Sequence, residues 1–180
     1  MAQALQETGQ RASADLYLEI QLFYARQMPL LEARKLEEFL ETFTEDGYIE
    51  HRPNGWKLVG RKQLLIEMTA RRGDPDKPKV EEISARDARE QNIAYYDGLV
   101  YRYWFDRIRV QILGDGAYQV NYQAIVTMTD RATGKVSFEP TTTVEDVLVR
   151  GADGELQTRS RTVTHDTPNW ADKIHNPVEG

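Results

Sequence analysis

The chain has 180 residues, a formal net charge of −6, 40% hydrophobic residues and no cysteine. This length suits a single domain with a substantial core. The acidic balance argues against a nucleic-acid surface, and the lack of cysteine excludes disulfides, thiolate metal sites and a cysteine nucleophile. No apolar run could span a membrane and the first residues lack the core of a signal peptide, so we expect a cytoplasmic protein.

The first third of the chain is predicted to be mainly helical. Residues 1–13 are polar and predict a mobile tail, before a single domain over 14–166 and a second tail over 167–180. Apolar residues at helical spacing indicate helices over 14–32 and 34–43. Pro29 lies inside the first pattern and predicts a bend or a division there.

A strand over 47–51 follows and ends at His51, before a turn and a return strand over 56–59. A third helix is predicted from Arg61 to about Arg71. Residues 79–98 are the least informative stretch, and both an insertion acting as a lid and a solvated surface loop fit them.

The remainder predicts antiparallel strands at about 99–113, 117–129, 136–149 and 155–165. The residues at even positions from 118 to 128 are apolar, which indicates a sheet with one face buried against the core. The apolar phase changes near Trp104 and Phe105, which predicts a bulge and a bend. Helices packed on such a sheet give an α+β cone with a cavity.

The opening of this domain carries a family resemblance. The run FYARQMPLLEARKLEEFLETFTEDG, from Phe23 to Gly47, precedes a strand with a polar end. It resembles the nuclear transport factor two-like superfamily, which includes ketosteroid isomerase, scytalone dehydratase, SnoaL-like polyketide cyclases and the beta subunits of ring-hydroxylating dioxygenases. The resemblance extends from about Asp15 to Asp166. It implies a cone of three N-terminal helices on a curved, mostly antiparallel sheet.

Three residues are the catalytic candidates. In ketosteroid isomerase the matching strand ends in a carboxylate base, and His51 stands there in this chain. A histidine can accept and return a proton near neutral pH, although a structural histidine at a strand end is the alternative. SnoaL-like proteins carry a histidine where this chain has Tyr103. The Tyr103 hydroxyl could donate a hydrogen bond to a substrate carbonyl, or the side chain could fill the core. Tyr24 lies one helical turn from the position that matches the tyrosine of ketosteroid isomerase that donates a hydrogen bond to the oxyanion. The alternative is that Tyr24 is an aromatic residue of the core.

A substrate cavity is expected between the first helix, the strand end and the first long strand. Its predicted walls carry side chains suited to a flat aromatic molecule: Ile20, Phe23, Gln27, Tyr101 and Phe105. Glu145, Asp146 and His165 are interpreted as structural, with Arg102, Arg159 or Arg161 as ion-pair partners. The three histidines, His51, His165 and His175, lie in separate segments and no nucleotide-binding loop is present, so neither a metal nor a cofactor is expected.

Three functions remain open. The first is a cofactor-independent cyclase, isomerase or dehydratase that acts on a hydrophobic, aromatic, polyketide-like molecule. The second is a non-catalytic subunit similar to the dioxygenase beta subunits, and the third is a small-molecule-binding pathway protein. Cones of this type usually present the outer sheet face to a second copy, so a homodimer or higher oligomer is expected through uncharged polar positions: Gln119, Asn121, Gln123 and Thr127.

Overall fold

The computed structural model describes residues 12–53, 55–69 and 98–167. Within these ranges the helices are α1 (Ala14–Glu32), α2 (Leu36–Glu41) and α3 (Arg61–Thr69). The Ser13 hydroxyl caps α1 by accepting the Leu16 backbone N–H at 3.1 Å. Pro29 does not divide α1. Pro29 and Ala25, the residue four positions before it, are both exposed, so water can satisfy the carbonyl that a proline leaves without a partner.

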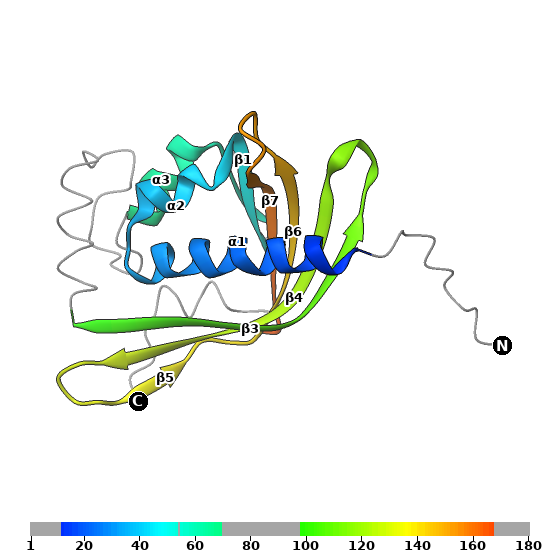
Figure 1. The fold of residues 1–180 in the computed structure, drawn as a ribbon. Helices are drawn as coiled ribbons and strands as arrows, with labels where there is room; N and C mark the ends of the chain where they lie inside the picture. Colours follow the sequence, from blue (N-terminus) through cyan, green and yellow to red (C-terminus); the bar gives the residue numbers. More distant parts are fainter. Residues whose placement is uncertain (1–11, 54, 70–97, 168–180) are drawn as a thin grey trace.

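The strands form one sheet in the order β2-β1-β7-β6-β4-β3, with β5 paired to β4. All pairs are antiparallel except β1 with β7. This arrangement confirms the predicted α+β cone (Figure 1). The bounds of the strands are β1 Phe43–Arg52, β2 Trp56–Val59, β3 Leu99–Ile112, β4 Tyr118–Asp130, β5 Val136–Phe138, β6 Thr142–Arg150 and β7 Leu156–His165.

Three details of the sheet differ from the prediction, and the first is that β1 begins at Phe43 and not at residue 47. The strand expected over 136–149 is divided into β5 and β6, and Pro140, which cannot donate to a ladder, lies between them. The bulge expected near Trp104 lies slightly later, where the register of β3 against β4 shifts between Asp106 and Arg109. Arg107 takes a positive φ of 58° there. The segment 70–97 and both predicted tails, apart from residues 12, 13 and 167, lie outside the described residues.

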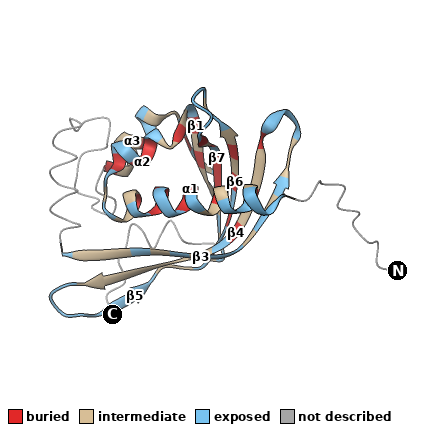
Figure 2. Ribbon diagram, viewed as in Figure 1, coloured by how far each residue is buried: buried red, intermediate tan, exposed pale blue. Residues whose placement is uncertain are grey.

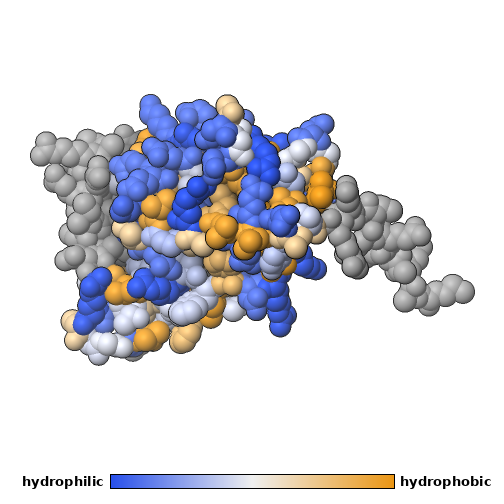
Figure 3. Space-filling model, viewed as in Figure 1, coloured by the Kyte–Doolittle hydropathy of each residue, from blue (hydrophilic) through white to orange (hydrophobic). Residues whose placement is uncertain are grey.

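The helices cover one face of the sheet, which we call the inner face. In Figure 1, α1 lies along the arm formed by β3 and β4, while α2 and α3 lie beside β1. The buried residues gather between these layers (Figure 2). One hydrophobic cluster joins α1 to β4 and β6, and the other joins α2 and α3 to β1 and β2. The side of α1 away from the sheet exposes Leu18 and Leu22, and apolar surface lies along that helix in Figure 3.

Candidate functional site

The predicted base, His51, lies against a second histidine on the inner face. β1 and β7 run parallel, with His51 level with Val163, and His165 projects two residues beyond Val163. Nδ1 of His51 lies 3.0 Å from Nε2 of His165. The ring planes differ by only 21° and their centroids are 5.3 Å apart. Rings in this arrangement meet edge to edge, so the hydrogen bond runs close to the ring planes. We call His51 and His165 the histidine pair.

Trp56 completes a row of three half-buried rings. It pairs with His51 across β1 and β2, and its ring lies 5.2 Å from the His51 ring at an angle of 28°. Burial lowers the pKa of His165 to about 4, with the nearby Asp166 carboxylate acting in the opposite direction. His165 is therefore neutral at pH 7. A neutral imidazole has one N–H and one lone-pair nitrogen, and so can act as donor or acceptor towards His51.

The aromatic candidates of the first long strand lie on the inner face of β3. Tyr101, Tyr103 and Phe105 are half-buried, and Tyr103 packs against both hydrophobic clusters. The backbone N–H of Tyr103 donates to Glu32 Oε1 at 2.9 Å, and Arg102 pairs with the same carboxylate at 3.3 Å. These contacts fix the β3 arm to the end of α1. A substrate contact by Tyr101, Tyr103 or Phe105 stays a prediction.

A buried polar network lies further along the same face. Arg161 donates from Nε to Asp146 Oδ1 at 2.9 Å and from Nη2 to Oδ2 at 2.7 Å. The Tyr24 hydroxyl donates to Asp146 Oδ2 at 2.9 Å, and Tyr122 reaches the same oxygen at 3.4 Å. Arg161 also donates to Gln27 Oε1 at 2.6 Å. Both members of the ion pair are buried, so their charges are satisfied within the protein.

The network accounts for the first-helix candidates. Tyr24 is 0% exposed and its single hydroxyl proton is directed at Asp146. Burial, with the Asp146 charge, raises the pKa of Tyr24 well above its usual value, so the hydroxyl remains protonated. Ile20, Phe23 and Gln27 are likewise buried in the described structure. These four side chains fill the space between α1 and the sheet.

The trio of Glu145, Asp146 and His165 does not form one ion-pair cluster. Asp146 has the predicted type of partner in Arg161. Glu145, which alternates to the other face, accepts from Gln119 Nε2 at 2.7 Å. His165 lies against His51, with which it shares a hydrogen bond, and the ion-pair interpretation of that residue stays a prediction. Sequence reasoning also missed Trp56, which it treated only as part of a return strand.

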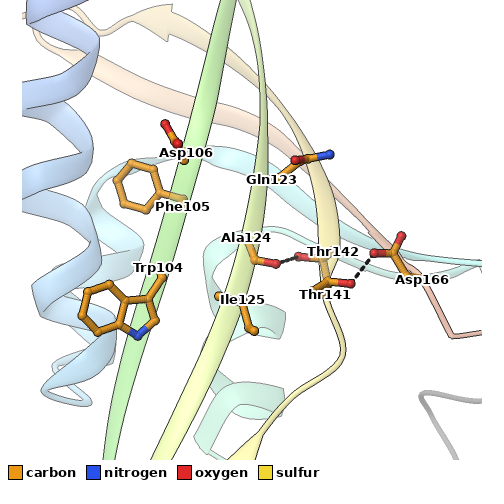
Figure 4. Close-up of a pocket in the computed structure, with 9 residues that line it drawn as sticks. All are labelled: Trp104, Phe105, Asp106, Gln123, Ala124, Ile125, Thr141, Thr142 and Asp166. Atoms are coloured by element: carbon orange, nitrogen blue, oxygen red, sulfur yellow. Dashed lines mark hydrogen bonds between the residues drawn. The ribbon is translucent and has the colours of Figure 1, made fainter.

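A hollow of about 490 Å³ lies where β3, β4 and the start of β6 meet. Trp104, Asp106 and Gln123 contribute from the face opposite the helices, and Figure 4 shows them on β3 and β4, with Asp166 beyond β6. Trp104 is 58% exposed, and its indole N–H donates to Thr127 Oγ1 at 3.1 Å. An exposed tryptophan beside polar groups is typical of a contact surface.

The described residues contain neither a cluster of metal ligands nor a membrane-spanning helix. Among residues 12–53, 55–69 and 98–167, no group of three or more histidine or carboxylate side chains is placed to hold a metal ion. In the same ranges, no helix has the length and apolar character needed to cross a membrane.

Comparison with known proteins identifies the family. A model of the SnoaL-like domain matches residues 12–162. The chain belongs to the SnoaL-like family. Aln2 from a Streptomyces species is similar to it, with 31% identity, coverage of 87% of this chain and 95% of that one, and a TM-score of 0.66. ActVI-ORFA from Streptomyces coelicolor is 29% identical over 85% of this chain and 98% of that one, with a TM-score of 0.63.

A third solved structure shows a ligand complex within the family. The protein from Catenulispora acidiphila in complex with S-DNPA is 32% identical to this SnoaL-like chain, over 86% of this chain and 96% of that one, with a TM-score of 0.63. A ketosteroid isomerase-like protein from Erwinia carotovora atroseptica is 16% identical with a TM-score of 0.52, which shows the shared fold alone. A search of curated proteins finds no match.

Proposed function

We propose that this SnoaL-like chain is a cofactor-independent cyclase, isomerase or dehydratase that acts on a hydrophobic, aromatic, polyketide-like molecule. The observation that carries the proposal is the position of His51 at the end of β1, on the face that the helices cover. There it is bonded to His165 and lies beside Trp56. A ring nitrogen held in this way can remove a proton from carbon next to a substrate carbonyl and return it at another position.

The aromatic character of the surroundings supports this substrate class. Trp56 and the β3 aromatics Tyr101, Tyr103 and Phe105 offer flat faces for a fused-ring molecule. We propose that the Tyr103 hydroxyl donates to the substrate carbonyl and stabilises the enolate that forms when the proton leaves. The complex of the Catenulispora acidiphila protein with S-DNPA supports small-molecule binding by this type of domain.

Proton transfer can be tested without knowledge of the natural product. The full chain is incubated in D₂O with S-DNPA or with a bicyclic aryl ketone such as 1-tetralone, and deuterium incorporation next to the carbonyl is followed by mass spectrometry or NMR. His51→Ala is expected to lower the catalysed exchange by roughly 10²–10⁴-fold. Tyr103→Phe is expected to lower it by up to about 10²–10³-fold, because an enolate donor is lost.

The control for these variants is Thr164→Ala. Thr164 is exposed and points away from the inner face, next to the histidine pair in sequence. This variant should keep the exchange rate of the original chain. If the His51→Ala variant exchanges substrate protons as fast as the Thr164→Ala variant while remaining folded, His51 is not the base.

A second function is favoured by one specific observation. The side chains of α1 that were expected to line a cavity, including Phe23 and Tyr24, are buried in the core. This packing suits a domain that binds its ligand without turnover, or one that supports a larger partner. Binding of S-DNPA by the full chain, measured by calorimetry, without any deuterium exchange would favour this second function.

We also propose that the chain forms a homodimer through the outer face of the sheet. The exposed Trp104 and the hollow beside it supply an apolar centre. The neighbouring positions Gln119, Asn121, Gln123 and Thr127 carry uncharged polar side chains that can hydrogen-bond to a second copy.

A further inference from the structure

We infer that His165 is a positioning residue that fixes the protonation form of His51, accepting the Nδ1–H of His51 and leaving Nε2 of His51 as the basic nitrogen. The consequence for catalysis rests on the proposed function, whereas the hydrogen-bond direction is a property of the pair itself. Nothing in the sequence pairs these residues, which lie 114 positions apart.

The direction of the bond depends on the protonation state of each ring. When His51 is doubly protonated, both of its ring nitrogens carry N–H groups, and its Nδ1 nitrogen lies 3.0 Å from His165 Nε2. Two N–H groups cannot face each other at this distance, so His165 must present a lone pair. It can do so because burial depresses the pKa of His165 to about 4 and keeps that ring neutral. A neutral His165 ring can therefore accept the Nδ1–H of His51.

The proton balance of the proposed step is complete. The substrate C–H proton moves to Nε2 of His51, and the electrons of the C–H bond become the enolate. The His51 imidazolium keeps its Nδ1–H on His165 Nε2 and returns the Nε2 proton to the substrate at the new position. No oxidant, reductant or second substrate is required.

Two contacts hold the geometry in which this bond forms. The parallel pairing of β1 with β7 sets the His51 backbone level with Val163, and antiparallel pairing with β6 places His165 opposite Thr142. Trp56 lies beside the opposite side of the His51 ring and restricts its rotation. An aromatic face next to His51 also stabilises the imidazolium form by cation–π attraction.

The test compares His165→Gln with His165→Leu in the full chain. Glutamine retains a polar acceptor of similar reach, and leucine removes it. Thr164→Leu is the matched control, because it adds the same apolar side chain one residue away on the opposite, exposed face. Circular dichroism spectra of all three variants establish that they are folded.

The direct readout is the tautomer of His51, from long-range ¹H–¹⁵N spectra of ¹⁵N-histidine-labelled protein. The signals of the three histidines are assigned with His51→Gln, His165→Gln and His175→Gln. We expect the original chain, the glutamine variant and the Thr164→Leu control to show neutral His51 protonated at Nδ1. The leucine variant should shift His51 towards the form protonated at Nε2. A His51 tautomer that is the same with leucine as with the original His165 would overturn the inference.

The exchange assay separates this inference from the proposed function. If both hold, His165→Leu should lower deuterium exchange by on the order of 10–100-fold, and His165→Gln should restore it to within a few-fold of the original chain. If His51→Ala leaves exchange unchanged while the tautomer still follows residue 165, the proposed function fails and the pairing stands. If exchange requires His51 but the His51 tautomer is the same whichever residue stands at position 165, the inference about the pair is wrong and the proposed function still holds.

Discussion

The ion pair of Asp146 and Arg161 should be the most sensitive point of the core, and Asp146→Asn tests this. The substitution keeps the shape of the side chain but removes its charge. Arg161 cannot lose its proton, and its side chain is only 7% exposed. Removing one partner of a buried pair typically costs about 3–5 kcal/mol, so the free energy of unfolding should fall by that amount. For a domain of this length the melting temperature should fall by roughly 6–20 °C.

The two tyrosines of the network provide graded comparisons. Tyr24→Phe removes a 2.9 Å hydrogen bond to a charged oxygen, which is worth about 1.5–3 kcal/mol. Tyr122→Phe removes a contact of 3.4 Å to the same oxygen and should cost under about 1 kcal/mol. The assay is urea denaturation followed by circular dichroism, with the slope of free energy against urea compared between variants.

The three variants should differ in rank order as well as in magnitude. Asp146→Asn should destabilise most, Tyr24→Phe less and Tyr122→Phe least. Asp146→Asn combined with Arg161→Met should recover part of the loss, since no unpaired charge is left in the core. The account of the network is refuted if Asp146→Asn costs less than about 1 kcal/mol, or if Tyr122→Phe costs as much as Tyr24→Phe.

Two further predictions concern the histidine pair and the outer face. Unfolded His165 binds a proton below its ordinary pKa of about 6.5, whereas the folded residue does so only near pH 4, so its stabilising contribution should be lost as the pH falls between these values. After allowance for partial exposure the loss is about 1–2 kcal/mol. Urea midpoints from pH 7 to pH 4 should therefore fall less for His165→Gln than for the original chain, and equal falls would contradict the assignment. Light scattering should give twice the 20.8 kDa chain mass, and Trp104→Glu should lower it to the monomer mass; a monomeric original chain would refute the dimer.

The fold was predictable because each element has a strong local signal. The helical spacing of apolar residues predicted α1 with the bounds that the structure has, and the capping Ser13 lies where the pattern begins. The alternating residues of β4 likewise marked its buried face, with Val120 and Tyr122 in the core. Errors arose where a backbone property outweighed the pattern. Pro140 lies where one predicted strand is divided into β5 and β6, and the bulge near Arg107 depends on a positive φ that the apolar phase change only approximates.

The site was less predictable because its contacts cross between distant segments. His51 was identified from the end of its own strand, but the importance of His165 depends on a parallel pairing of β1 with β7 that no local pattern indicates. His165 follows a run of alternating residues that includes Arg161, so an ion pair was a reasonable interpretation. The parallel register instead brings the ends of the two strands together, and a histidine lies at or next to each end.

The buried network explains why the candidates on α1 were hard to distinguish from core residues. A tyrosine on the apolar face of a helix can serve as a donor to substrate or as a donor to a buried carboxylate, and both uses give the same helical spacing. The deciding partner, Asp146, lies 122 residues away. Its own charge is balanced by Arg161 from a third element. The network therefore fixes α1 to the sheet, which is why we place the proposed chemistry at the histidine pair, at the ends of β1 and β7, and not on α1.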